Sequence, residues 1–165
     1  DIDLSASIIL EKCAIEFNSS TIPQNLQINS PNLRELKLRN SPFVGAIDLS
    51  LAHNLKELLV NSTDISSVIL PTSLNPVGSG TGPTYETFID IRNNDVSISN
   101  IEDMIGQIHQ WVVVNGYDFG TNSDSRFDLT SSSGVNQTSY LVSPAAFAKL
   151  QAIANNAGWE VFPAP

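Results

Sequence analysis

The sequence predicts an α/β fold in which short parallel strands stack as a solenoid and the C-terminal units contain helices. Three observations predict it: a pattern repeated within residues 32–70, its return near residue 89, and two helical segments in the C-terminal half. Leu33, Leu36, Leu38, Phe43 and Ile47 recur at one constant offset as Leu55, Leu58, Val60, Ile65 and Ile69. A fixed period of this length is typical of a solenoid, in which each turn buries its apolar face against the next.

The pattern extends towards the N-terminus in a degenerate form. Ile15 and Phe17 have the same mutual spacing as Leu36 and Leu38, and we align them with that pair, so a first repeat is expected to begin near Lys12. Because an equal spacing implies an equal position in each turn, this alignment places Ile15 beside Leu36 and Phe17 beside Leu38.

The segment after residue 70 interrupts the period. Residues 71–85 are rich in Gly, Pro and Ser, which predicts an insertion loop. The pattern resumes at Ile89 and Ile91, which match Leu58 and Val60 across the interruption. We therefore expect a single domain over residues 1–165, with regular repeats at 12–70, the loop at 71–85 and closing units at 86–165.

A first helix is predicted soon after the pattern resumes. Ser99 and Glu102 fit a capping box, in which the two side chains bind free amides at a helix start. Apolar residues follow at helical spacing, at Ile101, Met104, Ile105, Ile108 and Val112. Asn115-Gly116 supplies a stop signal, so we place this helix at about 100–113.

A second helix is predicted near the end of the chain. Ser143 fits an N-cap, Pro144 the first helical position, and Gly158 the position just past the end. A short strand pattern precedes each helix, at 88–91 and at 127–129. A tetrad of Gly, an aromatic residue, an acid and an apolar residue follows each helix, at 116–119 and at 158–161. These segments predict strand-helix-strand units that close the solenoid.

The strands of the repeat separate buried from exposed side chains. Alternation along each strand places Leu36, Leu58 and Ile89 in one apolar column and points the residues between them to the other face. That concave face is the expected binding surface, and its candidate residues are Glu16, Asn18, Glu35, Lys37, Arg39, Glu57, Leu59, Asn61, Asp90 and Arg92. The alignment also puts Ala14 beside Glu35 and Glu16 beside Lys37.

The repeat resembles the bacterial leucine-rich repeat family, in the form whose units are about 21–22 residues long. The resemblance covers about residues 12–98 and is carried by Asn32-Leu33-Arg34-Glu35-Leu36-Lys37-Leu38, Ala46-Ile47-Asp48-Leu49-Ser50 and Asn54-Leu55-Lys56-Glu57-Leu58-Leu59-Val60. The family's usual Asn after the strand is replaced by Ser41 and Thr63 and occurs only as Asn94. The C-terminal part resembles closing units found in surface proteins of Bacteroidetes-type bacteria and in structural proteins of their phages.

The resemblance implies binding rather than catalysis. Our leading hypothesis is a non-enzymatic adhesion or protein-binding module, extracellular or at the cell surface, whose partner is a protein or a cell-surface glycan. The alternative is a tail, baseplate or fibre protein of a virion, held by homo-oligomer contacts. A polysaccharide-binding accessory domain is the third hypothesis. None of these needs a cofactor.

Charge and composition argue against two classes of partner. The formal net charge is -9, from 8 basic and 17 acidic residues, so the overall field repels nucleic acid and anionic membranes. No run of about 18 apolar residues is present, and we expect no membrane insertion.

The chain begins with Asp1 rather than Met, and we expect secretion or excision from a longer chain. The single cysteine, Cys13, is expected to be a small buried apolar residue.

Few residues offer catalytic or metal-binding chemistry. His53 and His109 share no spacing with a nucleophile or an acidic cluster, and we expect structural or solvent-exposed roles for both. Oxygen ligands for Ca²⁺ are present in one turn, at Asp118, Asn122, Asp124 and Asp128, although solvated turn residues are the favoured interpretation. Aromatic residues suited to sugar stacking occur at Trp111, Tyr117 and Trp159, where packing in the core is favoured.

Overall fold

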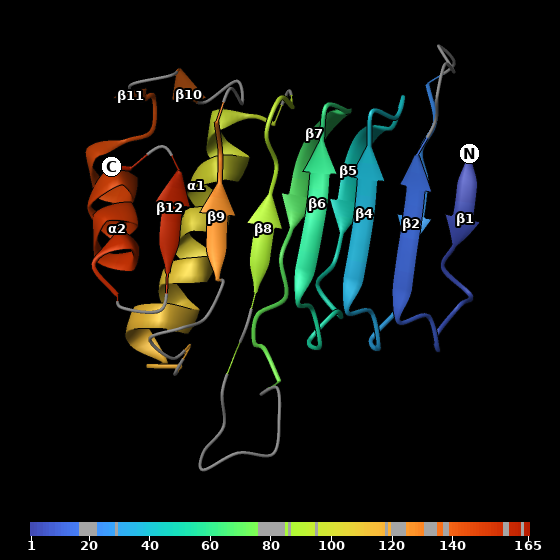
Figure 1. Ribbon diagram of the computed structural model, residues 1–165, viewed down its shortest axis with the longest axis horizontal. Helices are drawn as coiled ribbons and strands as arrows, with labels where there is room; N and C mark the ends of the chain where they lie inside the picture. Colours follow the sequence, from blue (N-terminus) through green and yellow to red (C-terminus); the bar gives the residue numbers. More distant parts are fainter. Residues whose placement is uncertain are drawn as a thin grey trace.

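The computed structural model has an α/β fold, with mostly parallel strands and two α-helices in the part of the chain that it describes, as the sequence predicts (Figure 1). It describes residues 1–16, 23–28, 30–75, 85, 87–94, 96–117, 119, 125–130, 135–136, 139–156, 159–162 and 164–165. Residues 76–84, most of the predicted insertion loop, lie outside the described residues.

A sheet of six parallel strands, here called the front sheet, forms one side of the molecule. Its strands are β2 (Lys12–Glu16), β4 (Glu35–Arg39), β6 (Glu57–Asn61), β8 (Phe88–Asp90), β9 (Arg126–Asp128) and β12 (Glu160–Phe162). They are hydrogen-bonded in the order β12-β9-β8-β6-β4-β2, so strands of this sheet that follow one another along the chain are also neighbours in it. The described strands thus form an open row that ends at β2 and β12.

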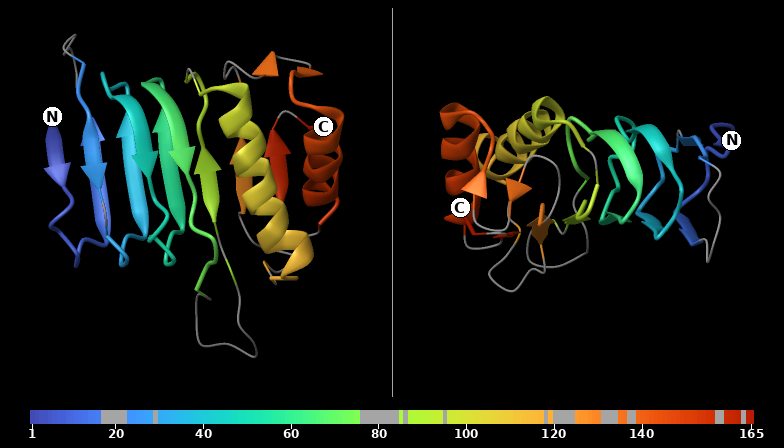
Figure 2. Two further views of the ribbon diagram at one scale, coloured as in Figure 1. Left: turned by 180° about the vertical axis from the view of Figure 1, so that it is seen from behind. Right: turned by 90° about the horizontal axis from the view of Figure 1, so that it is seen from above.

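The opposite side, here called the back wall, changes from strands to helices along the molecule (Figure 2). Its strands are β1 (Ile2–Leu4), β3 (Leu26–Ile28), β5 (Val44–Asp48) and β7 (Asp64–Ile69), and its helices are α1 (Ile98–His109) and α2 (Pro144–Ala154). The strands pair in parallel as β1-β3 and β5-β7. A short antiparallel pair, β10 (Val135–Asn136) and β11 (Ser139–Tyr140), precedes α2.

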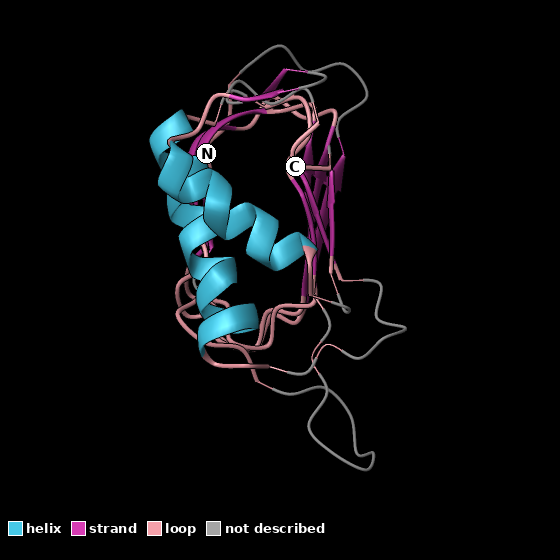
Figure 3. Ribbon diagram, turned by 90° about the vertical axis from the view of Figure 1, so that its left-hand side faces the viewer, coloured by secondary structure: helices cyan, strands magenta, loops and turns pink. Residues whose placement is uncertain are grey.

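The strand register confirms the predicted columns in the middle of the chain. Leu36 lies opposite Leu58, and Leu58 lies opposite Ile89. These side chains are fully buried between the front sheet and the back wall, whose layers are seen end-on in Figure 3. Burying one such side chain stabilises the fold by about 1.5–3 kcal/mol.

The register of the first repeat is shifted relative to the prediction. Cys13 lies opposite Leu36 and Ile15 opposite Leu38, whereas the prediction placed Ile15 opposite Leu36. The alignment on Ile15 and Phe17 was therefore wrong, because it passed over a small thiol that fits the apolar column. Cys13 is buried, as expected, and burial raises the pKa of its thiol. Phe17 lies outside the described residues.

The turns that follow β4, β6 and β8 share one backbone feature. Asn40, Ser62 and Asn93 have positive φ angles of 48°, 54° and 54°. This left-handed conformation is uncommon for residues with a side chain, and Asn is among those that adopt it most readily. The same backbone conformation therefore recurs at matched positions after three neighbouring strands of the front sheet.

The residue after each left-handed position is polar and buried. Asn94 receives hydrogen bonds on Oδ1 from the amide and hydroxyl of Thr63, at 3.2 and 2.5 Å. Its Nδ2 donates to the carbonyl oxygens of Val60 and Ile91. Ser41 donates to the carbonyl of Arg39 at 2.6 Å. These side chains bind backbone groups that the turn leaves unpaired, which a buried turn requires.

Helix α1 begins slightly earlier than the prediction. The amide of Asn100 donates to the hydroxyl of Ser97, which is the N-cap, at 3.3 Å. The predicted capping box of Ser99 and Glu102 does not form. Glu102 instead accepts a hydrogen bond from the amide of Ser143 at 2.5 Å, so its carboxylate joins the start of α2 to α1.

The C-terminal end of α1 widens into a π-helical segment, Gln110–Val114. Trp111 and Val112 of this segment are buried, and the amide of Tyr117 donates to the carbonyl of Trp111 at 3.1 Å. The helical stripe that the sequence shows thus continues through Val112, as predicted, but in a wider helix. The π-helical turn places both side chains in the core.

The two predicted strand-helix-strand units differ in their last element. Helix α2 begins as predicted, because Ser143 accepts a hydrogen bond from the amide of Ala146 at 3.3 Å and Pro144 follows it. Its tetrad continues into β12. The described residues of the first tetrad, Gly116, Tyr117 and Phe119, lie in a loop, so the strand predicted there is absent from them. Gly158 lies outside the described residues.

Candidate functional site: the outer face of the front sheet

The outer face of the front sheet carries side chains from every strand in matched rows. The first row is Lys12, Glu35, Glu57, Phe88, Arg126 and Glu160. The second is Ala14, Lys37, Leu59, Asp90, Asp128 and Phe162, and the third begins with Glu16, Arg39 and Asn61. We call this set of rows the outer face. It is the surface predicted to bind a partner.

The rows correct the predicted neighbours at the N-terminal edge. Glu16 lies beside Arg39 rather than Lys37, and Ala14 lies beside Lys37 rather than Glu35. The residue beside Glu35 is Lys12. This follows from the shifted register, and it brings opposite charges together at both ends of β2.

Four side chains of the outer face form a chain of ion pairs across β2, β4 and β6. Lys12 contacts Glu35 at 2.5 Å, and Lys37 contacts Glu35 at 3.5 Å and Glu57 at 2.6 Å. The hydrogen bond from Lys12 lowers the pKa of Glu35, and the bond to Glu57 raises the pKa of Lys37. All four groups reach solvent, so salt screens these interactions. These ion pairs therefore order the four side chains more than they stabilise the fold.

A shallow pocket of about 250 Å³ lies beside this chain of ion pairs. Its lining is Ala14, Ile15, Glu16, Lys37 and Arg39. Glu16 and Arg39 are exposed and of opposite charge. The pocket lining therefore combines two apolar residues with three charged ones.

Two buried aspartates anchor the outer face further along the sheet. Asp90 accepts hydrogen bonds from the side chain of Arg92 at 2.9 and 2.7 Å, and from Asn61 at 3.3 Å. Burial alone would raise the pKa of Asp90, but the bonds from Arg92 and Asn61 lower it. Arg92 also lies 3.6 Å from Asp128 on the next strand. The carboxylates of Asp90 and Asp128 thus hold the guanidinium of Arg92, while the Arg92 side chain stays 42% exposed.

Arg126 is held in a similar way and is flanked by aromatic rings. Its Nη2 contacts Asp128 at 2.6 Å, and the guanidinium carbon lies 4.0 Å from the ring centre of Phe162 and 5.7 Å from that of Phe88. The nearer contact has the geometry of a cation–π interaction. The Nε of Arg126 is buried and has no hydrogen-bond partner among the described residues. Two guanidiniums and two aromatic rings thus share one end of the outer face.

Two predicted binding residues are not available at the surface. Leu59 is 3% exposed and Asp90 is 2% exposed, so neither is free of packing, contrary to the prediction for this face. Burial of Asp90 is tolerated because Arg92 neutralises its charge. The remaining described candidates, Glu16, Glu35, Lys37, Arg39, Glu57, Asn61 and Arg92, are exposed or half-buried. Asn18 lies outside the described residues.

Sequence reasoning missed five residues of the outer face, which are Lys12, Arg126, Asp128, Glu160 and Phe162. Lys12 was missed because of the register error, and Arg126 and Phe162 because they lie beyond the regular repeat. A signal for Arg126 was present in Arg126-x-Asp128, which mirrors Asp90-x-Arg92. The sequence instead groups Asp128 with Asp118, Asn122 and Asp124, for which solvated turn residues are favoured over Ca²⁺ ligands.

The Ca²⁺ hypothesis receives no geometric support from the described part of the chain. The carboxylate of Asp128 is paired with Arg126, while Asp118, Asn122 and Asp124 lie outside the described residues. Among the residues that the structure describes, no group of three or more His, Cys, Asp or Glu side chains is placed to hold a metal ion.

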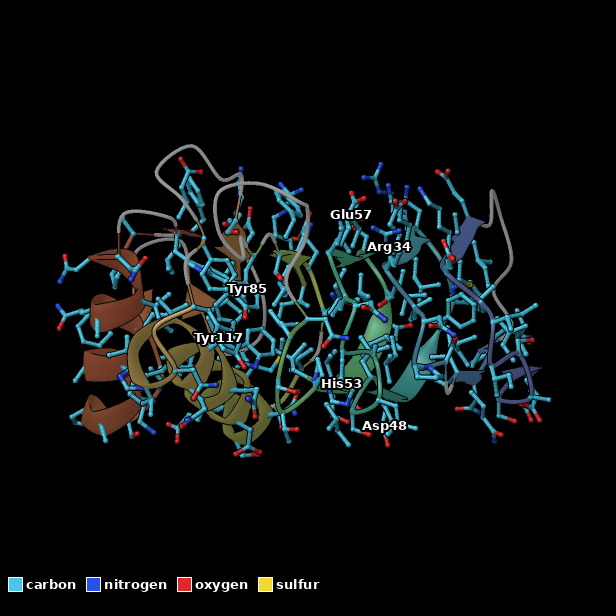
Figure 4. All side chains as sticks on the ribbon, turned by 90° about the horizontal axis from the view of Figure 1, so that it is seen from below. Arg34, Asp48, His53, Glu57, Tyr85 and Tyr117 are labelled. Carbon is cyan, nitrogen blue, oxygen red and sulfur yellow. The ribbon has the colours of Figure 1, made fainter. Side chains whose placement is uncertain are left out.

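Local packing or a hydrogen bond holds His53 and the aromatic residues Trp111, Tyr117 and Trp159. His53 Nδ1 lies 2.9 Å from the carbonyl oxygen of Ser73. Trp111 and Trp159 are buried, which confirms the predicted packing role. Tyr117 stacks on Tyr85 with ring centres 4.2 Å apart, and both lie away from His53 in the view of Figure 4.

Comparison with known proteins does not assign a family. No protein-family model matches the chain, and no curated protein or solved structure matches it. Among the described residues, no helix has the length and apolar character needed to cross a membrane. The functional interpretation therefore depends on the chemistry of the outer face.

Proposed function

We propose that this protein is a leucine-rich-repeat-like solenoid that serves as a non-enzymatic binding module. In this proposal it acts outside the cell or at the cell surface and contacts a partner protein through the outer face. The pairing of Leu36 with Leu58, one repeat apart, supports the repeat interpretation. The recurrent left-handed turns at Asn40 and Ser62 support it as well. Repeat proteins commonly bind through such extended rows of strand side chains.

The observation that carries the proposal is the pair of anchored arginines. Arg92 and Arg126 are each fixed by a buried aspartate, yet each keeps part of its side chain in solvent. Arginine and aromatic side chains dominate the binding energy of many protein interfaces. Because Asp90 and Asp128 already hold the guanidiniums, little side-chain freedom is lost when a partner binds.

The chain of ion pairs supports a protein partner. Lys12, Glu35, Lys37 and Glu57 alternate in charge across the three strands. Such an arrangement favours a partner with complementary charges of both signs, which a protein surface supplies. A nucleic acid would meet a protein of net charge -9, whose field opposes its approach.

Among the described residues, His53 and Cys13 have structural environments, which agrees with the proposed non-enzymatic role. His53 is hydrogen-bonded to the backbone of Ser73. Burial raises the pKa of Cys13, which disfavours the thiolate needed for nucleophilic attack.

Site-specific photo-cross-linking tests this proposal even though the partner is unidentified. A photoreactive amino acid replaces Arg39 on the outer face or, as the matched control, the exposed Asp48 on the back wall. In the cells that produce the protein, we expect a protein adduct of defined mass from position 39 and none from position 48. Adducts only from position 48 would contradict the proposed surface.

A further inference from the structure

The N-terminal edge of the front sheet ends in an unpaired strand. Among the described strands, β4 is the only one hydrogen-bonded to β2. The amide of Glu35 donates to the carbonyl of Glu11 at 3.1 Å, so the backbone groups of residues 11, 13 and 15 face β4. Because these groups alternate along a strand, those of Lys12, Ala14 and Glu16 point to the free edge. An unpaired edge of this kind is a template for another strand.

The back wall extends one strand further than the front sheet at this end. Strand β1 pairs with β3, and Figures 1 and 2 show it lying beyond β2. The front sheet therefore ends at β2 while the back wall continues to β1, and we call this offset between the two sides the step. A strand added to β2 would lie over β1, as β2 lies over β3. It would give β1 the front-sheet strand that it lacks among the described strands.

The step is apolar on its inner side. Ile2, Leu4, Leu10 and Ile15 pack against the core but are only partly buried, whereas Leu38, the neighbour of Ile15, is fully buried. Two further apolar residues nearby, Ile8 and Ile9, are 63% and 80% exposed. Inward-facing side chains of an added strand would cover Ile15 and the partly exposed residues of β1.

The outward side chains of β2 define the charge of the segment that would fit. Lys12 stands near one end of the strand with its side chain 65% exposed, and Glu16 stands at the other end, also exposed. A parallel strand that places an acid beside Lys12 and a base beside Glu16 would be complementary at both ends. Apolar residues beside Cys13 and Ile15 would continue the inner columns.

We propose that this step binds an extended segment of a partner protein, which adds as a parallel strand to the free edge of β2. The segment has the pattern acid, apolar, any residue, apolar, base. A second copy that met this one through its own β2 edge would fit poorly, because β1 projects beyond β2 in both copies. The site shares Lys12, Ala14 and Glu16 with the outer face, but it uses the free backbone edge of β2 and the apolar residues on the inner side. The inference therefore does not depend on the proposed function.

Peptide binding monitored by amide hydrogen exchange tests the proposal. The probe is a synthetic peptide with the central sequence Glu-Leu-Thr-Val-Lys, and the control peptide exchanges its two charged residues. With saturating probe, we expect exchange at the amides of Lys12, Ala14 and Glu16 to slow at least about tenfold. We expect the control peptide to bind at least about tenfold more weakly. No slowing, or equal binding of the two peptides, would overturn the proposal.

Two variants of the protein make the test specific. The double variant Lys12→Glu with Glu16→Lys is expected to reverse the preference between the two peptides. Ala14→Pro removes an amide that points to the free edge and spares those facing β4, so we expect an unchanged unfolding midpoint and lost peptide binding. Unaltered binding by both variants would contradict the site. A dimer in the absence of peptide that Ala14→Pro abolishes would assign the edge to a second copy instead.

Discussion

The side chain of Asn100 is hydrogen-bonded to both backbone groups of Val68. The amide of Val68 donates to Oδ1 at 2.8 Å, and Nδ2 donates to its carbonyl at 2.9 Å. Asn100 lies in the first turn of α1, and Val68 lies in β7. The side-chain amide thus takes the place of a neighbouring strand, and this is how the back wall changes from strands to helices without unpaired groups at Val68.

Asn100→Asp tests this connection. A carboxylate still accepts from the amide of Val68 but cannot donate to its carbonyl, so we expect a loss of about 1–3 kcal/mol in the free energy of unfolding. Urea denaturation measures it. Ser99→Asp on the exposed side of the same turn is the matched control, and a similar loss in both variants would show that charge near the helix start, rather than the lost hydrogen bond, is responsible.

Asn94→Asp tests the buried turn. The substitution keeps the acceptor for Thr63 but removes the donors to the carbonyls of Val60 and Ile91, and it places a carboxylate in a buried site. We expect a loss of about 3 kcal/mol or more in the free energy of unfolding at pH 7. Thermal unfolding followed by circular dichroism measures the change. A variant as stable as the parent would contradict the role given to Asn94.

Ser62→Gly is expected to stabilise the protein. Ser62 has a φ of 54°, and glycine adopts this conformation without the steric cost that other residues carry. The expected gain is about 0.5–1 kcal/mol in the free energy of unfolding, net of the greater freedom of glycine in the unfolded chain. Ser66→Gly, within strand β7, is the control and should destabilise. A loss at both positions would argue against a left-handed turn at Ser62.

Asp90 gives stability a defined dependence on pH. Its pKa is lower in the folded protein than its ordinary value of 3.8, so its contribution is complete above about pH 4 and falls as the pH drops through the folded pKa. We therefore expect the stability difference between the parent and Asp90→Asn to be largest at neutral pH and to shrink below pH 4. Urea denaturation at pH 7 and pH 3 measures it. A difference independent of pH would contradict the ionised state of Asp90.

The middle of the fold was predictable because its periodic signal is strong. The pair Leu36 with Leu58 follows from spacing alone, and the pair Leu58 with Ile89 follows from the return of the same apolar pattern after the loop. The register of the N-terminal strand was not predictable, because Cys13 is a weak apolar signal and because Ile15 and Phe17 offered a competing alignment. The left-handed turns were also hidden, since Asn40, Ser62 and Asn93 are ordinary polar residues in sequence.

The candidate site was predictable as a face but not as a set of contacts. Alternation along strands identified Lys37 and Arg39 as outward-facing residues. It did not reveal that Asp90 is buried, because a pairing with Arg92 and a contact between Arg92 and Asp128 depend on tertiary packing. The same limitation hid Arg126 and Phe162, whose strands lie outside the regular period.

The affinity of the cross-linked partner for two matched variants tests most directly whether the outer face is the binding surface. The front variant combines Arg39→Glu with Arg92→Lys, which keeps a positive charge beside Asp90 but loses the planar guanidinium. The back variant combines Asp48→Lys with Asp64→Lys. We expect the front variant to bind about 30-fold more weakly, as for the loss of an arginine hot spot, and the back variant to bind within about twofold of the parent. Weakened binding by the back variant alone would contradict the proposal.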